Sequence, residues 1–242
     1  MVIVTGASSG IGRATARAFA DAGDLVLAVG RRQDELTATS AGYPSMRIHV
    51  GDLRDPAEPR RTVEAALGHW GRLDVLVNNA GIFAQQPIEA IDADEVQALL
   101  AINLVAPSLL VREAAPRLAP RRGVVVNVSS TLGSIAAPGA SLYGASKAAL
   151  DHATRSWAVE LAALGVRVNA VAPGPTESGA LAAAGMSEHA IEEVKTAEVA
   201  AIPLGRRGTP EDVAAWVLAL AGGGGAWVTG QVVGVDGGLA VA

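Results

Sequence analysis

The sequence predicts an α/β fold, a doubly wound, parallel seven-stranded sheet of the Rossmann type that forms a single domain over residues 1–242. Short apolar runs alternate with helical patterns along the whole chain. These runs lack polar alternation, which is expected when helices cover both faces of a parallel sheet through right-handed crossovers. No Pro/Ser-rich linker divides the chain.

Each element is expected where the pattern changes. Strands are expected at the apolar runs Met1–Val4, Leu25–Val29, Met46–Val50, Leu73–Val77, Gly123–Val128, Val166–Val171 and Gln231–Val235. Helices are expected between them, at Ile11–Ala22, Asp34–Thr39, Pro56–His69, Ala93–Leu118, Leu142–Leu164 and Pro210–Ala221. The least regular part, residues 175–208, is long enough to be an insertion that covers a ligand.

Composition excludes several classes of function. The net charge is −5 and no stripe of Lys and Arg appears, which argues against a nucleic-acid partner. The chain has no cysteine, which excludes disulfides and zinc–thiolate sites and fits the reducing cytoplasm. The four histidines lie far apart and share no metal-ligand spacing, so no metal site is expected.

No targeting or membrane segment is expected. Residues 2–4 already form part of a core strand, which leaves no room for a signal peptide. The longest uncharged run, residues 213–234, contains four consecutive glycines and is typical of a helix end, a turn and a strand start. A soluble, cytoplasmic protein is therefore expected.

A glycine-rich loop lies between the first strand and the first helix. Its spacing, G-x-x-x-G-x-G, lets the backbone reverse and lets a phosphate approach the main chain, while the helix N-terminus presents free N–H groups to that anion. The loop residues expected at the phosphates are Gly6, Ser8, Ser9, Gly10, Ile11 and Gly12. The alternative is a tight strand–helix turn in which Ser9 caps the helix.

Further motifs follow in order along the chain: TGASSGIG (Thr5–Gly12), NNAG (Asn78–Gly81), NVSS (Asn127–Ser130), YGASK (Tyr143–Lys147), APG (Ala172–Gly174), VTG (Val228–Gly230) and VDGG (Val235–Gly238). Together the motifs resemble the short-chain dehydrogenases/reductases of the classical type, including those similar to 3-oxoacyl-carrier-protein reductases. The resemblance covers the whole chain. It implies an oxidoreductase that moves hydride between a nicotinamide cofactor and a carbonyl or secondary alcohol.

The second strand ends in Gly30-Arg31-Arg32, without the carboxylate that would bind the ribose 2′-hydroxyl of NAD. A guanidinium binds a 2′-phosphate with paired charged hydrogen bonds, so NADP(H) is the preferred cofactor and NAD(H) the alternative. The two arginines could instead be solvated residues at a helix start. The resemblance implies that Asp52 and Leu53 contact the adenine ring, and that Asn79, Ala80 and Gly81 lie beside the adenine ribose.

Tyr143 and Lys147 are four residues apart on an expected helix and project from one face. A phenol with a pKa of ~10 exchanges protons poorly at neutral pH, whereas a nearby ammonium and an oxidised nicotinamide ring both lower that pKa. The resemblance implies that Tyr143 is the general acid in carbonyl reduction and the general base in alcohol oxidation. Lys147 would tune the phenol and hold the nicotinamide ribose.

Two further polar residues complete the expected catalytic set. Ser130 lies thirteen residues before Tyr143, at a strand end, where the resemblance implies a hydrogen bond to the substrate oxygen. Ser129 is the adjacent candidate. Asn103 is polar in an apolar helix; the resemblance implies that it binds a water linked to Lys147, and the alternative is a core amide that satisfies backbone groups.

After the sixth strand, the turn with Pro173, Gly174, Thr176 and Ser178 resembles the turn that binds the nicotinamide in this family. The main chain near Thr176 would hold the carboxamide. Pro175 stands where a larger apolar residue is common, and Ser178 stands where a threonine is common, which keeps a hydroxyl near the phosphates.

An NADP(H)-dependent ketoreductase is the expected function. The alternatives are an NAD-linked alcohol dehydrogenase of the same family and a non-catalytic nucleotide-sensing protein, since fold alone does not fix function. Small and apolar residues in the substrate regions favour an uncharged, moderately hydrophobic carbonyl compound, with 3-oxoacyl thioesters, steroid-like or polyketide ketones, quinones and sugar-derived ketones all open. The apolar end of the chain and the resemblance imply a homotetramer or homodimer.

Overall fold

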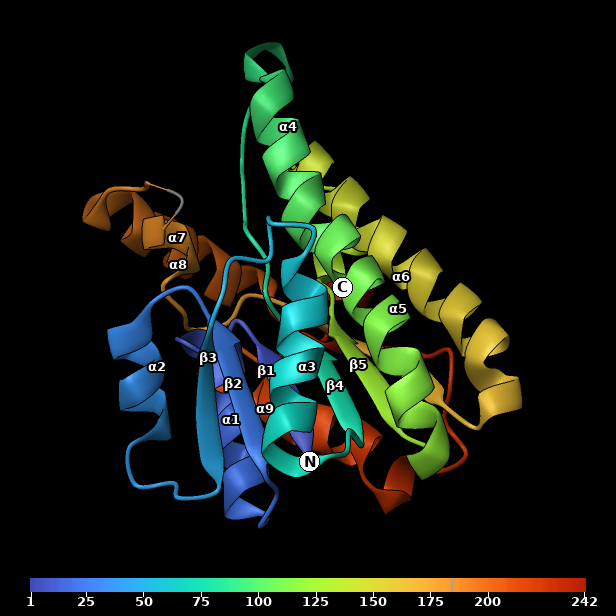
Figure 1. The fold of residues 1–242 in the computed structure, drawn as a ribbon. Helices are drawn as coiled ribbons and strands as arrows, with labels where there is room; N and C mark the ends of the chain where they lie inside the picture. The colour runs from blue at the N-terminus through green and yellow to red at the C-terminus, as the bar shows by residue number, and fades with distance from the viewer. Residues whose placement is uncertain (184) are drawn as a thin grey trace.

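A parallel sheet forms the centre of the computed structural model, which describes residues 1–183 and 185–242 (Figure 1). Its strands are β1 Val2–Thr5, β2 Val26–Gly30, β3 Met46–Val50, β4 Val75–Asn78, β5 Val124–Val128, β6 Arg167–Pro173 and β7 Val232–Val235. Their order is β3-β2-β1-β4-β5-β6-β7, and each pair of neighbours is parallel. The predicted fold is confirmed.

Helices cover both faces of the sheet. Those in the described residues are α1 Gly10–Asp21, α2 Gln33–Ser40, α3 Glu58–Trp70, α4 Ala93–Leu100, α5 Ala106–Leu118, α6 Ser141–Leu161, α7 Ala180–Ala183, α8 Glu188–Ala201 and α9 Pro210–Ala221. Helices α7 and α8 lie in the insertion between β6 and α9, beyond one end of the sheet (Figure 1).

Successive strand residues enter two separate cores. Ile3 and Leu27 pack with residues of α3, α5 and α6, whereas Val2 and Val26 pack with residues of α1 and α9. Because side chains alternate across a strand, both faces of these runs must be apolar, as the sequence is. Each fully buried Val or Leu contributes roughly 1.5–3 kcal/mol.

The helix expected over 93–118 has an irregular centre. Helices α4 and α5 are joined by a π-helical turn at Ala101–Val105. Pro107 has no N–H to donate to the carbonyl of residue 103, which removes one regular helical bond at this point. The turn places Asn103 on the buried side.

The same helical stretch, Ala93–Arg121, is by length and composition apolar enough to cross a membrane, and half of its most apolar window is buried within the protein. Leu110, Ala114 and Leu118 of α5 belong to the core beside the sheet. The stretch is therefore a core helix of this fold.

The carboxyl ends of the strands position the site. From β1 the strand order runs to β2 and β3 on one side and to β4 and β5 on the other, so the order of the strands reverses at β1. In open parallel sheets, ligands bind in the crevice at such a reversal of strand order.

Candidate active site

The loop between β1 and α1 requires glycine, at two positions for its backbone conformation and at Gly12 for space. Gly6 has φ +66° and Gly10 has φ +51°, a backbone conformation that favours glycine. A Cβ on Gly12 would lie 2.3 Å from the carbonyl oxygen of Gly6 and 2.4 Å from Nδ2 of Asn79. The loop is therefore a cradle of main chain, as a diphosphate requires.

Ser9 occupies the N-cap position of α1, but its side chain makes no capping hydrogen bond. Its hydroxyl instead accepts a hydrogen bond from Nη2 of Arg32 at 3.3 Å. Ser9 thus stands at the N-cap, as the alternative expected, but its side chain does not cap the helix. The first turn of α1 carries no acidic residue, so its positive end is not neutralised there.

Thr5 and Asn79 tie the glycine loop to the end of β4. Oγ1 of Thr5 accepts hydrogen bonds from the backbone N–H groups of Asn79 and Ala80, both at 3.0 Å. Nδ2 of Asn79 donates to the carbonyls of Thr5 at 2.8 Å and Gly6 at 3.3 Å. Residues 79–81, predicted beside the adenine ribose, thus border the predicted phosphate loop.

Three arginines lie near the residues predicted to contact the adenine. Arg31 and Arg32 are exposed after β2. Arg54 binds Asp52 through a fork of hydrogen bonds, and this contact chiefly holds the pKa of the Asp52 carboxyl below its usual value. Arg31 lowers the same pKa slightly, which places its charge near Asp52. Leu53 is buried beside them.

Tyr143 lies in the first turn of α6, where its phenol meets two neighbours. Ser130, at the end of β5, lies close enough to lower its pKa, and the ring of Phe83 packs edge-on at 5.0 Å between ring centroids. Burial raises the pKa of Tyr143 above 10, and the nearby Ser130 hydroxyl offsets only part of this. The predicted lowering of this pKa is therefore absent from the chain without cofactor.

Lys147 lies one turn further along α6 and is 4% exposed. Its ammonium donates to the carbonyl of Val128 at 2.9 Å and lies 5.8 Å from the centre of the Tyr143 ring. Burial lowers its pKa from 10.5 to about 8, and the nearby carboxylate of Asp151 raises it in part.

Asn103 meets the same cluster from the π-helical turn. Its amide accepts from the N–H of Ile82 at 2.9 Å and donates to the Ile82 carbonyl at 3.0 Å and to Oγ of Ser146 at 3.1 Å. These are the contacts expected of a buried amide that satisfies backbone groups. A Cβ on Gly81 would lie 3.3 Å from Oδ1 of Asn103 and 3.4 Å from Nζ of Lys147. The side chains of Asn103 and Lys147 therefore both approach Gly81.

The turn after β6 closes the other side. A Cβ on Gly174 would lie 2.8 Å from Cα of Asp236, and the Gly174 N–H donates to the Val235 carbonyl at 3.0 Å. Thr176 is buried, and its hydroxyl donates to the Gly174 carbonyl at 3.0 Å. A Cβ on Gly10 would lie 3.5 Å from Cβ of Ser178, so this turn reaches the glycine loop.

Three comparisons with known proteins fit this geometry. A family model described as enoyl-(acyl carrier protein) reductase matches residues 6–240. A solved structure of a short-chain dehydrogenase/reductase of unknown function from Caenorhabditis elegans, with cofactor, is 34% identical, has a TM-score of 0.94, and aligns over 100% of this chain and 95% of that one. The chain belongs to the short-chain dehydrogenase/reductase family.

Two relatives carry different names. A 3-oxoacyl-[acyl-carrier-protein] reductase from Thermotoga maritima is 38% identical over 99% of this chain and 97% of its own. A cis-4-hydroxycyclohexanecarboxylate dehydrogenase from Sinomonas cyclohexanicum is 36% identical over 98% of this chain and 95% of its own. As a short-chain dehydrogenase/reductase, the chain is an oxidoreductase for CH–OH/C=O groups that binds a nicotinamide dinucleotide.

Sequence patterns missed several side chains that build this short-chain dehydrogenase/reductase site. Asp151, Thr5 and Arg54 were not singled out for the contacts they make. Asp151 is 6% exposed, and within the described residues its Oδ1 has no hydrogen-bond partner. Its spacing of four from Lys147 was the one available signal. Among residues 1–183 and 185–242, no group of three or more His, Cys, Asp or Glu side chains could hold a metal ion.

Proposed function

We propose that this short-chain dehydrogenase/reductase is an NADP(H)-dependent ketoreductase whose catalytic set is Asn103, Ser130, Tyr143 and Lys147. The observation that carries the proposal is the meeting of three side chains: the Ser130 hydroxyl, close enough to the Tyr143 phenol to lower its pKa, and the buried ammonium of Lys147, 5.8 Å from the centre of the Tyr143 ring. This cluster lies beside a glycine cradle that fits a diphosphate.

The cofactor supplies a hydride to the carbonyl carbon when bound. Ser130 and Tyr143 both reach the carbonyl oxygen, where their hydroxyl groups stabilise the developing negative charge. Tyr143 donates its proton to that oxygen, and in alcohol oxidation it accepts a proton instead. A raised phenol pKa keeps Tyr143 protonated in the free chain, which suits reduction.

Lys147 and Asn103 act behind the phenol. With a pKa of about 8, Lys147 is largely protonated at pH 7 and can return a proton toward Tyr143. In this proposal Asn103 holds a water next to Lys147 through its backbone, because its side chain already bonds Ile82 and Ser146. The residues that bind the cofactor are Gly6, Ser8, Ser9, Gly10, Ile11, Gly12, Arg31, Arg32, Asp52, Leu53, Asn79, Ala80, Gly81, Tyr143, Lys147, Pro173, Gly174, Thr176 and Ser178.

A carbonyl panel assayed with NADPH and NADH in parallel tests the function. We expect faster oxidation of NADPH by the wild-type chain, and Tyr143→Phe should lower kcat by about a thousandfold or more because the proton donor is lost. NADPH binding should change little. A Tyr143→Phe variant that turns over normally would disprove the acid assignment.

The preference for NADP(H) rests on Arg31 and Arg32. Both are exposed at the end of β2, and Arg32 already contacts Ser9 of the phosphate loop. Arg31→Ala should weaken NADPH by about tenfold while leaving NADH nearly unchanged, because only the 2′-phosphate loses a charged partner. Equal losses for both nucleotides would contradict this preference.

The substrate proposed is an uncharged, moderately hydrophobic ketone. Phe83 packs against the Tyr143 ring, and the 133–142 segment that leads into α6 consists mainly of small and apolar residues. A 3-oxoacyl thioester, the substrate that the name of the Thermotoga maritima relative indicates, belongs in the first panel. Charged ketones should react more slowly.

The molecule is proposed to be cytoplasmic and to form a homotetramer or homodimer. Trp227 is 99% exposed, Val241 90% and Trp216 48%, all near the end of the chain. A contact between copies would cover them. Sedimentation at micromolar concentration should show a single species larger than the monomer, and a monomer would refute this.

A further inference from the structure

A buried arginine joins the turn after β6 to helix α8. The Arg207 side chain is 6% exposed. Its Nε lies 2.9 Å from Oε1 of Glu177, and its Nη1 forms an ion pair with Oε2 of Glu198. Glu177 follows Thr176 in the turn, whereas Glu198 belongs to α8. One guanidinium therefore bridges carboxylates from two separate segments.

The same guanidinium also fixes the main chain of the turn. Nη2 of Arg207 donates to the carbonyl of Thr176 at 2.8 Å. Next to it, the N–H of Glu177 donates to the Gly208 carbonyl at 2.8 Å, and the N–H of Gly208 donates to the Pro175 carbonyl at 2.9 Å. The turn is thus paired with residues 207–208 along its backbone.

A second ion pair joins α8 to the turn. Nζ of Lys195 lies 2.8 Å from Oε2 of Glu177, and this contact is the main reason that the pKa of Glu177 is below its usual value. With Arg207, Lys195, Glu177 and Glu198, the network contains two charges of each sign. Removal of Arg207 leaves the largely buried carboxylate of Glu198 without its partner in this network, and removal of Glu177 does the same to Lys195.

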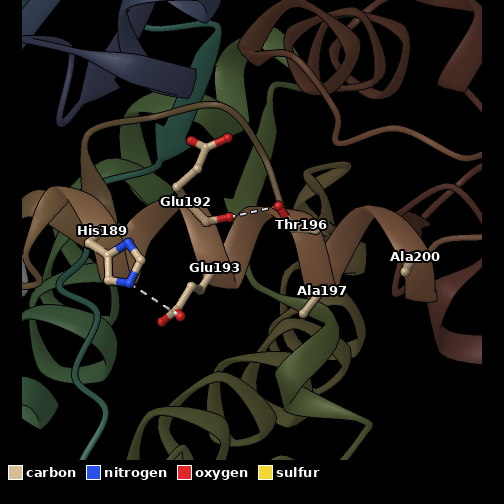
Figure 2. A pocket seen from close by; sticks show the side chains of 6 residues that line it. All are labelled: His189, Glu192, Glu193, Thr196, Ala197 and Ala200. Carbon is tan, nitrogen blue, oxygen red and sulfur yellow. Dashed lines mark hydrogen bonds and ion pairs between the residues drawn. The ribbon is translucent and has the colours of Figure 1, made fainter.

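The opposite face of α8 takes no part in this network. His189, Glu192, Glu193, Thr196, Ala197 and Ala200 line a shallow hollow on that face (Figure 2). There His189 pairs with Glu193 at 3.4 Å, and the Thr196 hydroxyl donates to the Glu192 carbonyl at 2.9 Å, both within the helix. Helix α8 therefore carries one carboxylate that pairs with Arg207, Glu198, and others on the opposite face that lie outside the network, such as Glu192.

We propose that Arg207 is a positioning residue that fixes α8 against the turn predicted to bind the nicotinamide, so that cofactor affinity depends on docked α8. The inference rests on the proposed function of this turn. The physical reason is preorganisation: a site that is competent only part of the time binds more weakly in proportion to the competent fraction. Once the cofactor is bound the turn is ordered, so the rate at saturation should be retained.

Matched variants test this role. Arg207→Met removes the bridge, and Arg206→Met removes an adjacent exposed arginine that pairs only with Asp212 among carboxylates of the described residues. Glu198→Gln removes the α8 anchor, and Glu192→Gln makes the same change on the other face. Arg207→Lys keeps the charge but not the planar fork.

The measurements are dissociation constants for NADPH and NADH, kcat at saturating nucleotide, and hydrogen exchange of residues 188–201. We expect Arg207→Met and Glu198→Gln to raise the dissociation constant of the better nucleotide by about tenfold and to change kcat by less than about twofold. The dissociation constant of Arg207→Lys should lie between those of the wild type and Arg207→Met. Bound nucleotide should slow hydrogen exchange of residues 188–201 in the wild type and in the controls Arg206→Met and Glu192→Gln. It should slow this exchange less in Arg207→Met and Glu198→Gln.

The outcomes separate this role from the proposed function. Equal dissociation constants in Arg207→Met and Arg206→Met would overturn the role of Arg207 while leaving the ketoreductase proposal intact. If Arg207→Met does not fold, the pair Glu198→Gln and Glu192→Gln decides by the same criterion. A wild-type chain that binds neither nucleotide would overturn the proposed function and this inference with it.

Discussion

Asp151 is the residue whose charge raises the pKa of Lys147, the lysine of the proposed catalytic set. It lies one turn after Lys147 on α6, and its carboxylate raises the pKa of the Lys147 ammonium against the effect of burial. Burial in turn raises the pKa of Asp151 itself, and the nearby Ser129 hydroxyl offsets part of this. A Cβ on Gly133 would lie 2.9 Å from Oδ2 of Asp151, which leaves space there only for glycine.

Asp151→Asn should therefore move the alkaline limb of the pH profile. Without the carboxylate, both the Lys147 ammonium and the Tyr143 proton are lost at lower pH, because a nearby negative charge favours the protonated forms. We expect the fall of kcat/KM for carbonyl reduction to shift down by about half a pH unit to one unit. Glu160→Gln, an exposed carboxylate on the same helix, is the control. An unchanged limb would show that Asp151 does not influence the proton donor.

At this scale, sequence patterns predicted the residues that local spacing brings together. Tyr143 and Lys147 share a helical face, and Gly6, Gly10 and Gly12 form one loop. Thr5 and Arg54 escaped notice because their partners are set by tertiary contacts, and Thr5 binds residues more than seventy positions away. The raised pKa of Tyr143 was also missed, because desolvation depends on the packed environment rather than on the motif.

In the loop from β1 to α1, the backbone passes closest to itself where Gly12 meets the Gly6 carbonyl. Gly12 lies in the first turn of α1, and the Gly6 carbonyl and the Asn79 amide occupy the space of its missing side chain. Backbone atoms cannot rotate away as a flexible side chain does. Any side chain at Gly12 must push the helix away from the loop.

Gly12→Ala should abolish nucleotide binding and lower the free energy of unfolding by roughly 2 kcal/mol or more, because the added methyl group forces a backbone shift in a packed region. Gly68→Ala is the control, since nothing lies within 4 Å of its Cβ position and it sits inside α3. That change should raise stability by about 0.5–1 kcal/mol. Urea unfolding and nucleotide titration measure both effects, and a Gly12→Ala variant that binds normally would contradict the phosphate role of the loop.

Element boundaries were predictable where the hydrophobic period was regular. The strands agree with the apolar runs to within a few residues. The π-helical turn at Ala101–Val105 was not predictable in this way, since an apolar run gives the same pattern for either winding. For α8, the sequence predicted only an insertion between the sixth strand and the last helix, without helix bounds. The residues that pair with α8, Glu177 and Arg207, lie outside it and are brought there by the fold.

For the whole molecule, the buried charge of Lys147 lowers the free energy of unfolding, and burial of apolar residues in the two cores offsets this loss. Lys147 is an ammonium held inside the fold, and the fall of its pKa from 10.5 to about 8 corresponds to roughly 3 kcal/mol. Burying a charge in this way is retained for chemistry rather than for stability. The balance between these two requirements can be measured directly.

Lys147→Met should stabilise the fold while eliminating turnover. Because the Val128 carbonyl and Asp151 lose their cationic partner, we expect a net gain of about 1–2 kcal/mol at pH 7 rather than the full value. The lysine is protonated in both folded and unfolded chains below pH 8, so the gain is complete there. Between pH 8 and 10.5 the unfolded chain holds more protons than the folded chain, so wild-type stability rises with pH and the gain disappears. Urea unfolding of the wild type and of Lys147→Met at pH 7, 9 and about 10.5 measures the difference in stability. The exposed Arg117→Met is the control. A loss of stability in Lys147→Met at pH 7 would show that the Val128 hydrogen bond outweighs desolvation.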